Sequence, residues 1–185
     1  MPSTALDEWT NDRRARLDEL EAHCAALLAG PATPTFLDET LRGFVLHLSA
    51  HFQAFCRDLY SECSQFWASL IPAGMQTTVA SQFSAQLALD KGNPSHENIK
   101  KDFNRFGFEV DLQAAHAEGP LRVTHLALLN AWRNKAAHRS RGDVVPPDLS
   151  LPEIRDWRAS CDGLAASLDA IMYDNLLRTT GVAPW

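Results

Sequence analysis

The strongest constraint on the fold is an apolar stripe with helical spacing, which begins near Thr35 or Asp38, continues to about Leu70 and is ended by Pro72 and Gly74. Only a helix places residues with this spacing on one face. Strand-like alternation is almost absent elsewhere, and Val and Ile are scarce beside Ala and Leu. The sequence therefore predicts an all-α, single-domain helical bundle with a long second helix. The apolar positions of the stripe are Leu41, Phe44, Val45, Leu48, Phe52, Phe55, Leu59 and Phe66.

Start and stop signals divide the rest of the chain into further helices. An N-terminal helix in residues 1–30 is expected to pack on a bundle formed by residues 31–185. Ser95 and Ser150 are expected to be N-caps. The helix that follows Ser95 is expected to end at Gly107, and the helix that follows Ser150 is expected to end at Gly181. A turn is expected over residues 111–117. The expected helices are 4–29, 76–90, 95 to about 106, 121–138 and 151–181.

The net charge excludes a protein that is basic all over. The 185 residues include 17 Lys and Arg against 23 Asp and Glu, a formal charge of -6. Only residues 120–143 have a positive net charge, because this segment contains five basic side chains and a single acid, Asp143. Such a segment can bind a phosphate chain locally, although Arg and Lys also favour an ordinary solvated helix end.

Several classes of protein and site are disfavoured by what the sequence lacks. No stretch of about 18 apolar residues is present, and the first residues do not form a secretory signal, so a cytoplasmic protein without membrane contact is expected. Cys24, Cys56, Cys63 and Cys161 form no C-x-x-C pair and are expected to be buried, reduced thiols. No metal site and no cofactor are predicted.

Three histidine positions are expected to have ordinary structural roles. His47 and His51 are four residues apart, but a third metal ligand is missing, so a packed or exposed pair is expected. His125 is expected to be a hydrogen-bonded core residue. His96 falls in the first turn of a short helix.

The late helix over residues 121–138 carries the most chemistry. At about 100° per residue, one face combines apolar side chains with His125 and is expected to be buried. The opposite face is polar, and we expect it to point away from the core, toward solvent, a ligand or a second subunit. The expected buried face is Leu121, His125, Leu128, Leu129, Trp132 and Ala136, and the opposite face is Asn130, Arg133, Asn134, Ala137, His138 and Arg141.

An arginine near a histidine suits metal-independent RNA cleavage. Histidine, with a pKa near 6.5, can take a proton from a 2′-hydroxyl or give one to a leaving 5′-oxygen. A guanidinium can stabilise charge that develops on phosphate oxygens. Arg133 and His138 suit these roles, and Asn134 could orient the imidazole or the phosphate. Similar Arg–His spacings at Arg16 to His23 and Arg42 to His47 lack this basic, polar setting. A twofold dimer would supply two copies around one groove.

The segment Leu-Asn-Ala-Trp-Arg-Asn-Lys-Ala-Ala-His-Arg resembles the R-N-x-x-x-H motif of the HEPN superfamily. HFQAFCRDLY and GNPSHENIKKDFNRFGF strengthen the resemblance, over residues 35–175, to the RiboL-PSP-HEPN branch. The resemblance implies a dimeric bundle with a shared cleft, and metal-independent endoribonuclease activity, often as a toxin of a toxin–antitoxin or phage-defence system. By this resemblance, the catalytic residues of the chain are expected to be Arg133, Asn134 and His138. Relatives also suggest acidic support from the preceding long helix, here Asp58 or Glu62.

Two functional hypotheses remain open from the sequence. The first is an endoribonuclease that leaves a 2′,3′-cyclic phosphate, with Lys135, Arg139 and Arg141 binding flanking phosphates. Its expected partners are RNA, a second copy of the chain and an antitoxin protein. The alternative is a catalytically inactive HEPN module that binds a partner protein, a nucleotide or RNA, and the acidic net charge motivates it.

Overall fold

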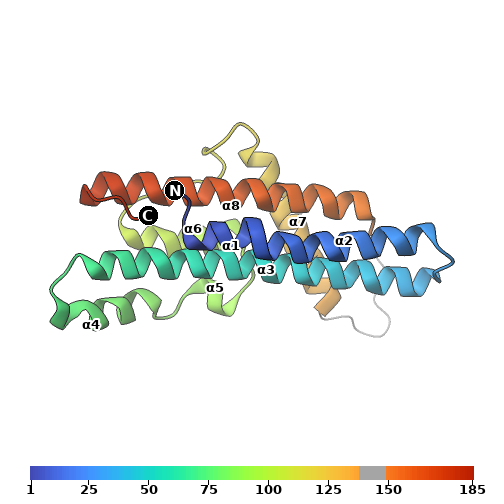
Figure 1. Cartoon of the computed structure of the whole chain (residues 1–185), viewed down its shortest axis with the longest axis horizontal. Coiled ribbons are helices and arrows are strands. Elements are labelled where there is room, and N and C mark those ends of the chain that lie inside the picture. Colours follow the sequence, from blue (N-terminus) through green and yellow to red (C-terminus); the bar gives the residue numbers. More distant parts are fainter. Residues whose placement is uncertain (138–148) are drawn as a thin grey trace.

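The computed structural model describes residues 1–137 and 149–185, and every regular element in these ranges is helical (Figure 1). This confirms the prediction of an all-α bundle. The elements are α1 (Thr4–Glu8), a π-helical turn (Trp9–Arg13), α2 (Arg14–Ala29), α3 (Pro34–Ser69), α4 (Ala73–Ser84), α5 (Ala88–Lys91), α6 (His96–Phe103), a 3-10 turn (Asn104–Phe106), α7 (Gly119–Ala137) and α8 (Leu151–Thr180).

The long helix α3 is the spine of the bundle. Its predicted apolar stripe is buried from Leu41 to Leu59, while Phe66 is partly buried. The N-terminal segment and α8 lie lengthwise along α3, and α7 crosses behind them at a steep angle (Figure 1). Because α3 contacts α1, α2, α4, α7 and α8, one continuous core connects the elements. The four cysteines are buried and unpaired, as predicted.

The N-terminal helix contains a π-helical turn that the sequence did not indicate. The turn adds one residue to the helical repeat, which brings Trp9 onto the same buried face as Leu17. The Trp9 ring packs against Phe52 and Phe55 with centroids 5.8 Å away in both cases. Its indole Nε1 donates to Asp162 at 2.9 Å. The first helix is therefore fixed to both α3 and α8.

The helix predicted over residues 76–90 is wrong as a single element. The chain leaves the helical conformation between α4 and α5, where Gln86 has a positive φ of 56°. The carboxylate of Asp102 accepts hydrogen bonds from the backbone of Ala88 at 2.9 Å and Leu89 at 2.8 Å. The guanidinium of Arg105 donates to the carbonyls of Phe83 and Ala85. These contacts from α6 and the turn after it satisfy the interrupted backbone, so tertiary structure makes the break.

The predicted caps are confirmed. Ser95 accepts from Asn98 at the start of α6, and Gly107 ends the following turn with φ 90°. Ser150 forms a capping box with Glu153, and Gly181 ends α8 in the left-handed conformation. The segment before α7 forms turns, as expected, but α7 begins at Gly119 rather than at residue 121.

Candidate functional site

The orientation of α7 differs from the prediction. Leu126, Leu129 and Asn130 are buried, whereas Leu121 and Leu128 are 56% and 46% exposed. Asn130 therefore faces inward, and the two leucines that were expected in the core face outward. The predicted faces are wrong at these positions because α7 packs against α3, α6 and α8 rather than against one surface.

His125 lies on the side of α7 that contacts α8. Its Nδ1 is 2.8 Å from the hydroxyl oxygen of Ser160, which confirms the predicted hydrogen bond, but His125 is only partly buried and is not the core residue that was expected. This contact and the burial of Leu129 fix the rotation of α7 about its axis. As a result, the polar side chains near its C-terminal end meet the loop between α5 and α6.

The candidate site is formed where α7 meets this loop. Asn93 donates from Nδ2 to Oδ1 of Asn134 at 2.8 Å, and Arg133 donates to the same oxygen at 3.4 Å. One turn earlier, Asn130 donates to the carbonyl of Pro94 at 3.3 Å. The two asparagines of α7 therefore bind consecutive residues of one loop.

This loop is held from two other helices. Gln53 of α3 donates to the carbonyls of Leu89 at 2.6 Å and Gly92 at 2.9 Å. Asn98 of α6 donates to the carbonyl of Asn93 at 2.8 Å. A Cβ at Gly92 would lie only 2.9 Å from Nδ2 of Asn98, so the absence of a side chain at Gly92 permits this bond. The loop thus presents Asn93 to α7 from a fixed backbone.

The electrostatics of this end of α7 are positive. Lys135 lies over the Trp132 ring at 5.4 Å, and Arg42 of α3 lies 5.7 Å from the same ring. Arg42 is buried and pairs with Asp38 at 2.8 Å. Arg133 has no carboxylate partner among residues 1–137 and 149–185. Its charge is therefore available to an anion.

One buried acceptor at the site also has no partner. Oδ1 of Asn130 is enclosed and receives no hydrogen bond from any described residue, although the side chain is only 6% exposed. A buried amide oxygen without a donor is rare in folded proteins. Asn130 therefore has an unused hydrogen-bond acceptor on the inward-facing side of α7.

The remaining predicted site residues of this region, His138, Arg139 and Arg141, lie outside the described residues. The structure thus brings together Arg133 and Asn134, with Lys135 beside them on Trp132.

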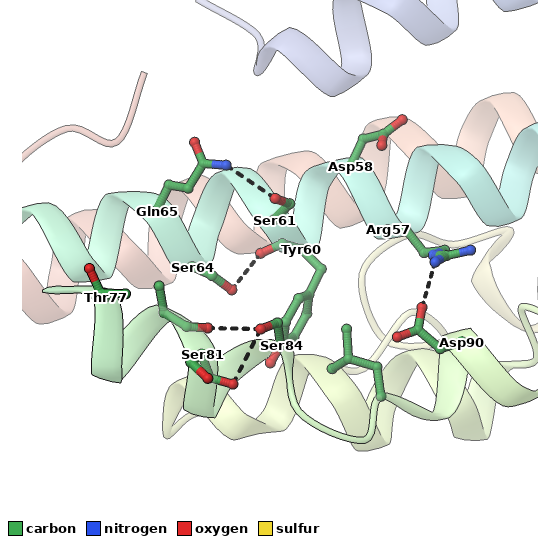
Figure 2. Close-up of a pocket in the computed structure, with 12 residues that line it drawn as sticks. Arg57, Asp58, Tyr60, Ser61, Ser64, Gln65, Thr77, Ser81, Ser84 and Asp90 are labelled. Carbon is green, nitrogen blue, oxygen red and sulfur yellow. Dashed lines mark hydrogen bonds and ion pairs between the residues drawn. The ribbon is translucent and has the colours of Figure 1, made fainter.

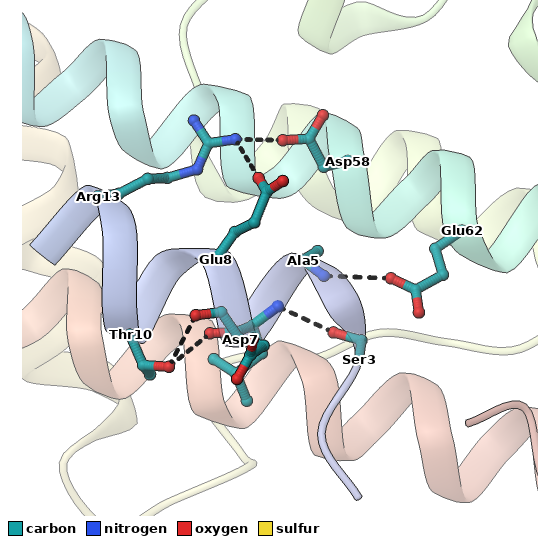
Figure 3. Close-up of polar contacts among 9 residues, drawn as sticks. Ser3, Ala5, Asp7, Glu8, Thr10, Arg13, Asp58 and Glu62 are labelled. Carbon is teal, nitrogen blue, oxygen red and sulfur yellow. Dashed lines mark hydrogen bonds and ion pairs between the residues drawn. The ribbon is translucent and has the colours of Figure 1, made fainter.

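Asp58 and Glu62, which are predicted as acidic support for the site, have partners in the N-terminal helical segment. Asp58 pairs with Arg13, which also contacts Glu8 at 3.1 Å (Figure 3). Glu62 accepts from the backbone of Thr4 at 3.1 Å and Ala5 at 3.2 Å. These carboxylates therefore attach the N-terminal helix to α3.

Asp58 and Glu62 lie farther along α3 than Gln53, which holds the loop of the candidate site. The α3 carboxylate that the contacts connect to Trp132 is Asp38, through its ion pair with Arg42. Burial raises the pKa of the Asp58 carboxyl, and the charge of Arg13 opposes this rise.

Away from the candidate site, a hollow lies between α3 and α4 (Figure 2). It is an open cleft of about 700 Å³, lined mainly by hydroxyl and amide side chains such as Ser61, Gln65 and Ser81. Arg57 at its edge is paired with Asp90 at 2.7 Å. No histidine or cysteine is among the residues that line the cleft, so its serine and threonine hydroxyls have no imidazole beside them there.

His47 and His51 on α3 form the histidine pair that was considered as a metal site. The rings of His47 and His51 stack with centroids 6.3 Å apart, which confirms a packed pair. Burial lowers the pKa of His51, and the charges of Arg13 and His47 add to the effect. In the described part of the chain, no three His, Cys, Asp or Glu side chains form a group that could hold a metal ion.

The helices of the described ranges include none with the length and apolar character needed to cross a membrane.

Comparisons with models of protein families, with curated proteins and with solved structures find no match for this chain. The resemblance to the HEPN superfamily therefore stays a prediction based on its motif residues.

Sequence reasoning missed Asn93 as a residue of the site. The signal was the tripeptide Gly92-Asn93-Pro94, which follows the helix expected over residues 76–90 and begins the segment GNPSHENIKKDFNRFGF that strengthens the resemblance. A loop of this kind between two helices predicts a turn, but it does not predict which distant helix the Asn side chain contacts.

Proposed function

We propose that this chain is a metal-independent endoribonuclease that cleaves RNA through attack of a 2′-hydroxyl on the adjacent phosphorus. The observation that carries the proposal is the Arg133–Asn134 pair: a guanidinium without a carboxylate partner in the described ranges, next to an amide fixed by the α5–α6 loop. Paired donors of this kind suit the phosphate oxygens of a reacting phosphodiester.

The chemistry requires two proton transfers. A base takes the proton of the 2′-hydroxyl while the 2′-oxygen bonds to phosphorus, and the bond from phosphorus to the 5′-oxygen breaks. The leaving 5′-oxygen receives a proton from an acid, and the products are a 2′,3′-cyclic phosphate and a 5′-hydroxyl. In the proposed mechanism His138 moves protons, Arg133 stabilises the charged phosphorane and Asn134 orients the reacting groups.

The proposed assembly is a homodimer with a composite site. Two motif copies would supply one histidine for each proton transfer and a larger positive surface. Leu121 and Leu128 are exposed and seven residues apart on one face of α7, which supports apolar contact with a second copy. Lys135, Arg139 and Arg141 would bind flanking phosphates. A role as a toxin of a toxin–antitoxin or phage-defence system, with an antitoxin partner, belongs to the same proposal.

The test is cleavage of a mixed cellular RNA pool by the wild-type chain, Arg133→Ala and His138→Ala. Arg14→Ala and His23→Ala are matched controls, because both side chains are exposed on α2. We expect cleavage by the wild type and both controls, cyclic phosphate ends, activity in EDTA, and no cleavage by either site variant. Upstream fragments with a 3′-hydroxyl, or equal cleavage by all five proteins, would contradict the mechanism.

The acidic net charge of -6 favours a second candidate, an inactive HEPN module that binds a partner protein, a nucleotide or RNA through the same face. This candidate predicts no cleavage by the wild type, and partner binding that is insensitive to salt and survives His138→Ala.

A further inference from the structure

The amide of Asn134 has a defined orientation, and its neighbours determine it. A guanidinium can only donate hydrogen bonds, so the Asn134 atom that faces Arg133 at 3.4 Å is the oxygen. The Asn93 atom that meets this oxygen at 2.8 Å must then be its Nδ2. The two contacts agree on the assignment of both amides, which a single contact could not fix.

This orientation leaves the other end of the Asn134 amide available. Because both hydrogen bonds of the amide are made by Oδ1, the Nδ2 group has no acceptor among the residues that the structure describes. Asn134 is exposed, so this donor faces a surface that a ligand can reach. It lies beside the guanidinium of Arg133, whose charge favours an anionic oxygen.

We infer that Asn93 is a positioning residue, which holds Oδ1 of Asn134 so that the Nδ2 of Asn134 donates to a non-bridging phosphate oxygen of RNA. This inference rests on the proposed function and assigns Asn134 to the phosphate, one of the two roles that the sequence left open. Asn93 acts through Asn134 and does not itself touch the substrate.

The loop that carries Asn93 is built to hold such a position. Gln53 and Asn98 fix its backbone with hydrogen bonds of 2.6 to 2.9 Å, from helices other than α7. Asn130 binds the adjacent Pro94 carbonyl, so the loop and α7 are joined at two successive turns of the helix. Displacement of a catalytic group by about 1 Å can reduce the rate about 100-fold.

The first test is a double-mutant cycle with steady-state cleavage of an RNA oligonucleotide. We expect Asn93→Ala to lower kcat about 10- to 100-fold with KM nearly unchanged, and Asn134→Ala to lower it at least as much. Because Asn93 acts through Asn134, the double variant should equal Asn134→Ala alone. Effects of the two single substitutions that multiply, or a wild-type rate for Asn93→Ala, would overturn the inference.

Asn93→Asp sharpens this test. A carboxylate cannot donate, and it attracts the Nδ2 of Asn134, so the amide is expected to turn and present its oxygen to the phosphate. We expect a larger loss of kcat than for Asn93→Ala, with an unchanged melting temperature. Asn11→Asp is the matched control, because Asn11 is an exposed asparagine of the N-terminal helical segment, and it should cleave at the wild-type rate.

A second readout does not depend on cleavage. The side-chain amide signals of Asn134 in ¹⁵N-labelled protein should shift in Asn93→Ala, and they should respond to an uncleavable 2′-deoxy oligonucleotide less than in the wild type. Identical Asn134 signals in the two proteins overturn the inference. A wild type without cleavage contradicts the proposed ribonuclease, and the shift of the Asn134 signals then decides the role of Asn93 by itself.

Discussion

Two arginines of the molecule have different kinds of partner: Arg13 in the N-terminal helical segment and Arg133 at the C-terminal end of α7. At the first, Arg13 pairs with Glu8 and Asp58, and Glu62 accepts two backbone donors of the first helix (Figure 3). At the second, Arg133 contacts only the amide of Asn134 among the described residues, and that amide is oriented by Asn93.

The difference shows how structural and functional polar groups can be distinguished. Arg13 forms ion pairs with Glu8 and Asp58, although its Nε is buried without a hydrogen-bond partner among the described residues. The donors around Arg133 are fixed in place but only partly used. A charged side chain without an ion-pair partner on a rigid support is typical of a binding or catalytic site, whereas ion pairing within the protein is typical of a structural contact.

The largest expected effect is on catalysis. Arg133→Ala should reduce RNA cleavage about 1,000-fold or more, because it removes a charge that stabilises the transition state. The free energy of unfolding, measured in urea, should change by less than about 0.5 kcal/mol, since the guanidinium has no ion pair among the described residues. Marked destabilisation by Arg133→Ala would mean that the two regions do not differ as proposed.

Trp9→Ala tests the opposite region. The indole is almost fully buried between α3 and α8 and contacts Phe52, Phe55 and Asp162. Its loss should lower the free energy of unfolding by about 3 to 5 kcal/mol. Trp185→Ala, which removes a less buried indole near Tyr173, should cost less. Equal costs for the two substitutions would show that the π-helical turn does not anchor the first helix.

Arg13→Ala is the direct counterpart of Arg133→Ala. It breaks contacts with Glu8 and Asp58, both of which have partly exposed side chains, so we expect a loss of about 1 kcal/mol in unfolding free energy. RNA cleavage by the folded variant should remain at the wild-type rate. If cleavage falls with Arg13→Ala, the N-terminal region is part of the site.

Ser150→Ala tests the start of α8, which follows the segment carrying the last basic residues of the motif region. The capping box with Glu153 should make this substitution cost about 1 kcal/mol in thermal or urea unfolding. Ser167→Ala in the interior of the same helix serves as the control and should leave stability unchanged or slightly higher. A cap that costs nothing would indicate that packing alone fixes the start of α8.

The smallest effect that we expect is a pH dependence from Asp169. Burial raises the pKa of this carboxyl and Glu62 adds to the rise, while hydrogen bonds from Ser3 oppose it. The folded state therefore holds the proton more tightly than the unfolded state, and this contribution to stability is lost as the pH rises through the raised pKa.

The measurement compares urea unfolding of the wild type and Asp169→Asn at pH 7 and pH 4.5. The wild type should gain stability relative to the variant as the pH falls, because Asn cannot titrate. A relative loss at pH 4.5 would mean that the ionised carboxylate is the form that stabilises the N-terminal segment.

Features with local causes could be predicted from the sequence. The apolar period of α3 and the side-chain cap of Ser95 depend on residues a few positions apart. The same is true of Ser150 with Glu153 at one end of α8 and of Gly181 at the other. The spacing of the residues also predicted that Arg133, Asn134 and Lys135 lie on a helix.

Features that depend on distant partners were decided by the tertiary structure. The break between α4 and α5 is stabilised by Asp102 and Arg105, which come from later elements. The rotation of α7 depends on packing against three elements at once, which no pattern within the helix contains. The pairing of Asn93 with Asn134 joins residues 41 positions apart. Periodicity and caps report the conformation of one segment, whereas the partner of a side chain is chosen by how the segments pack.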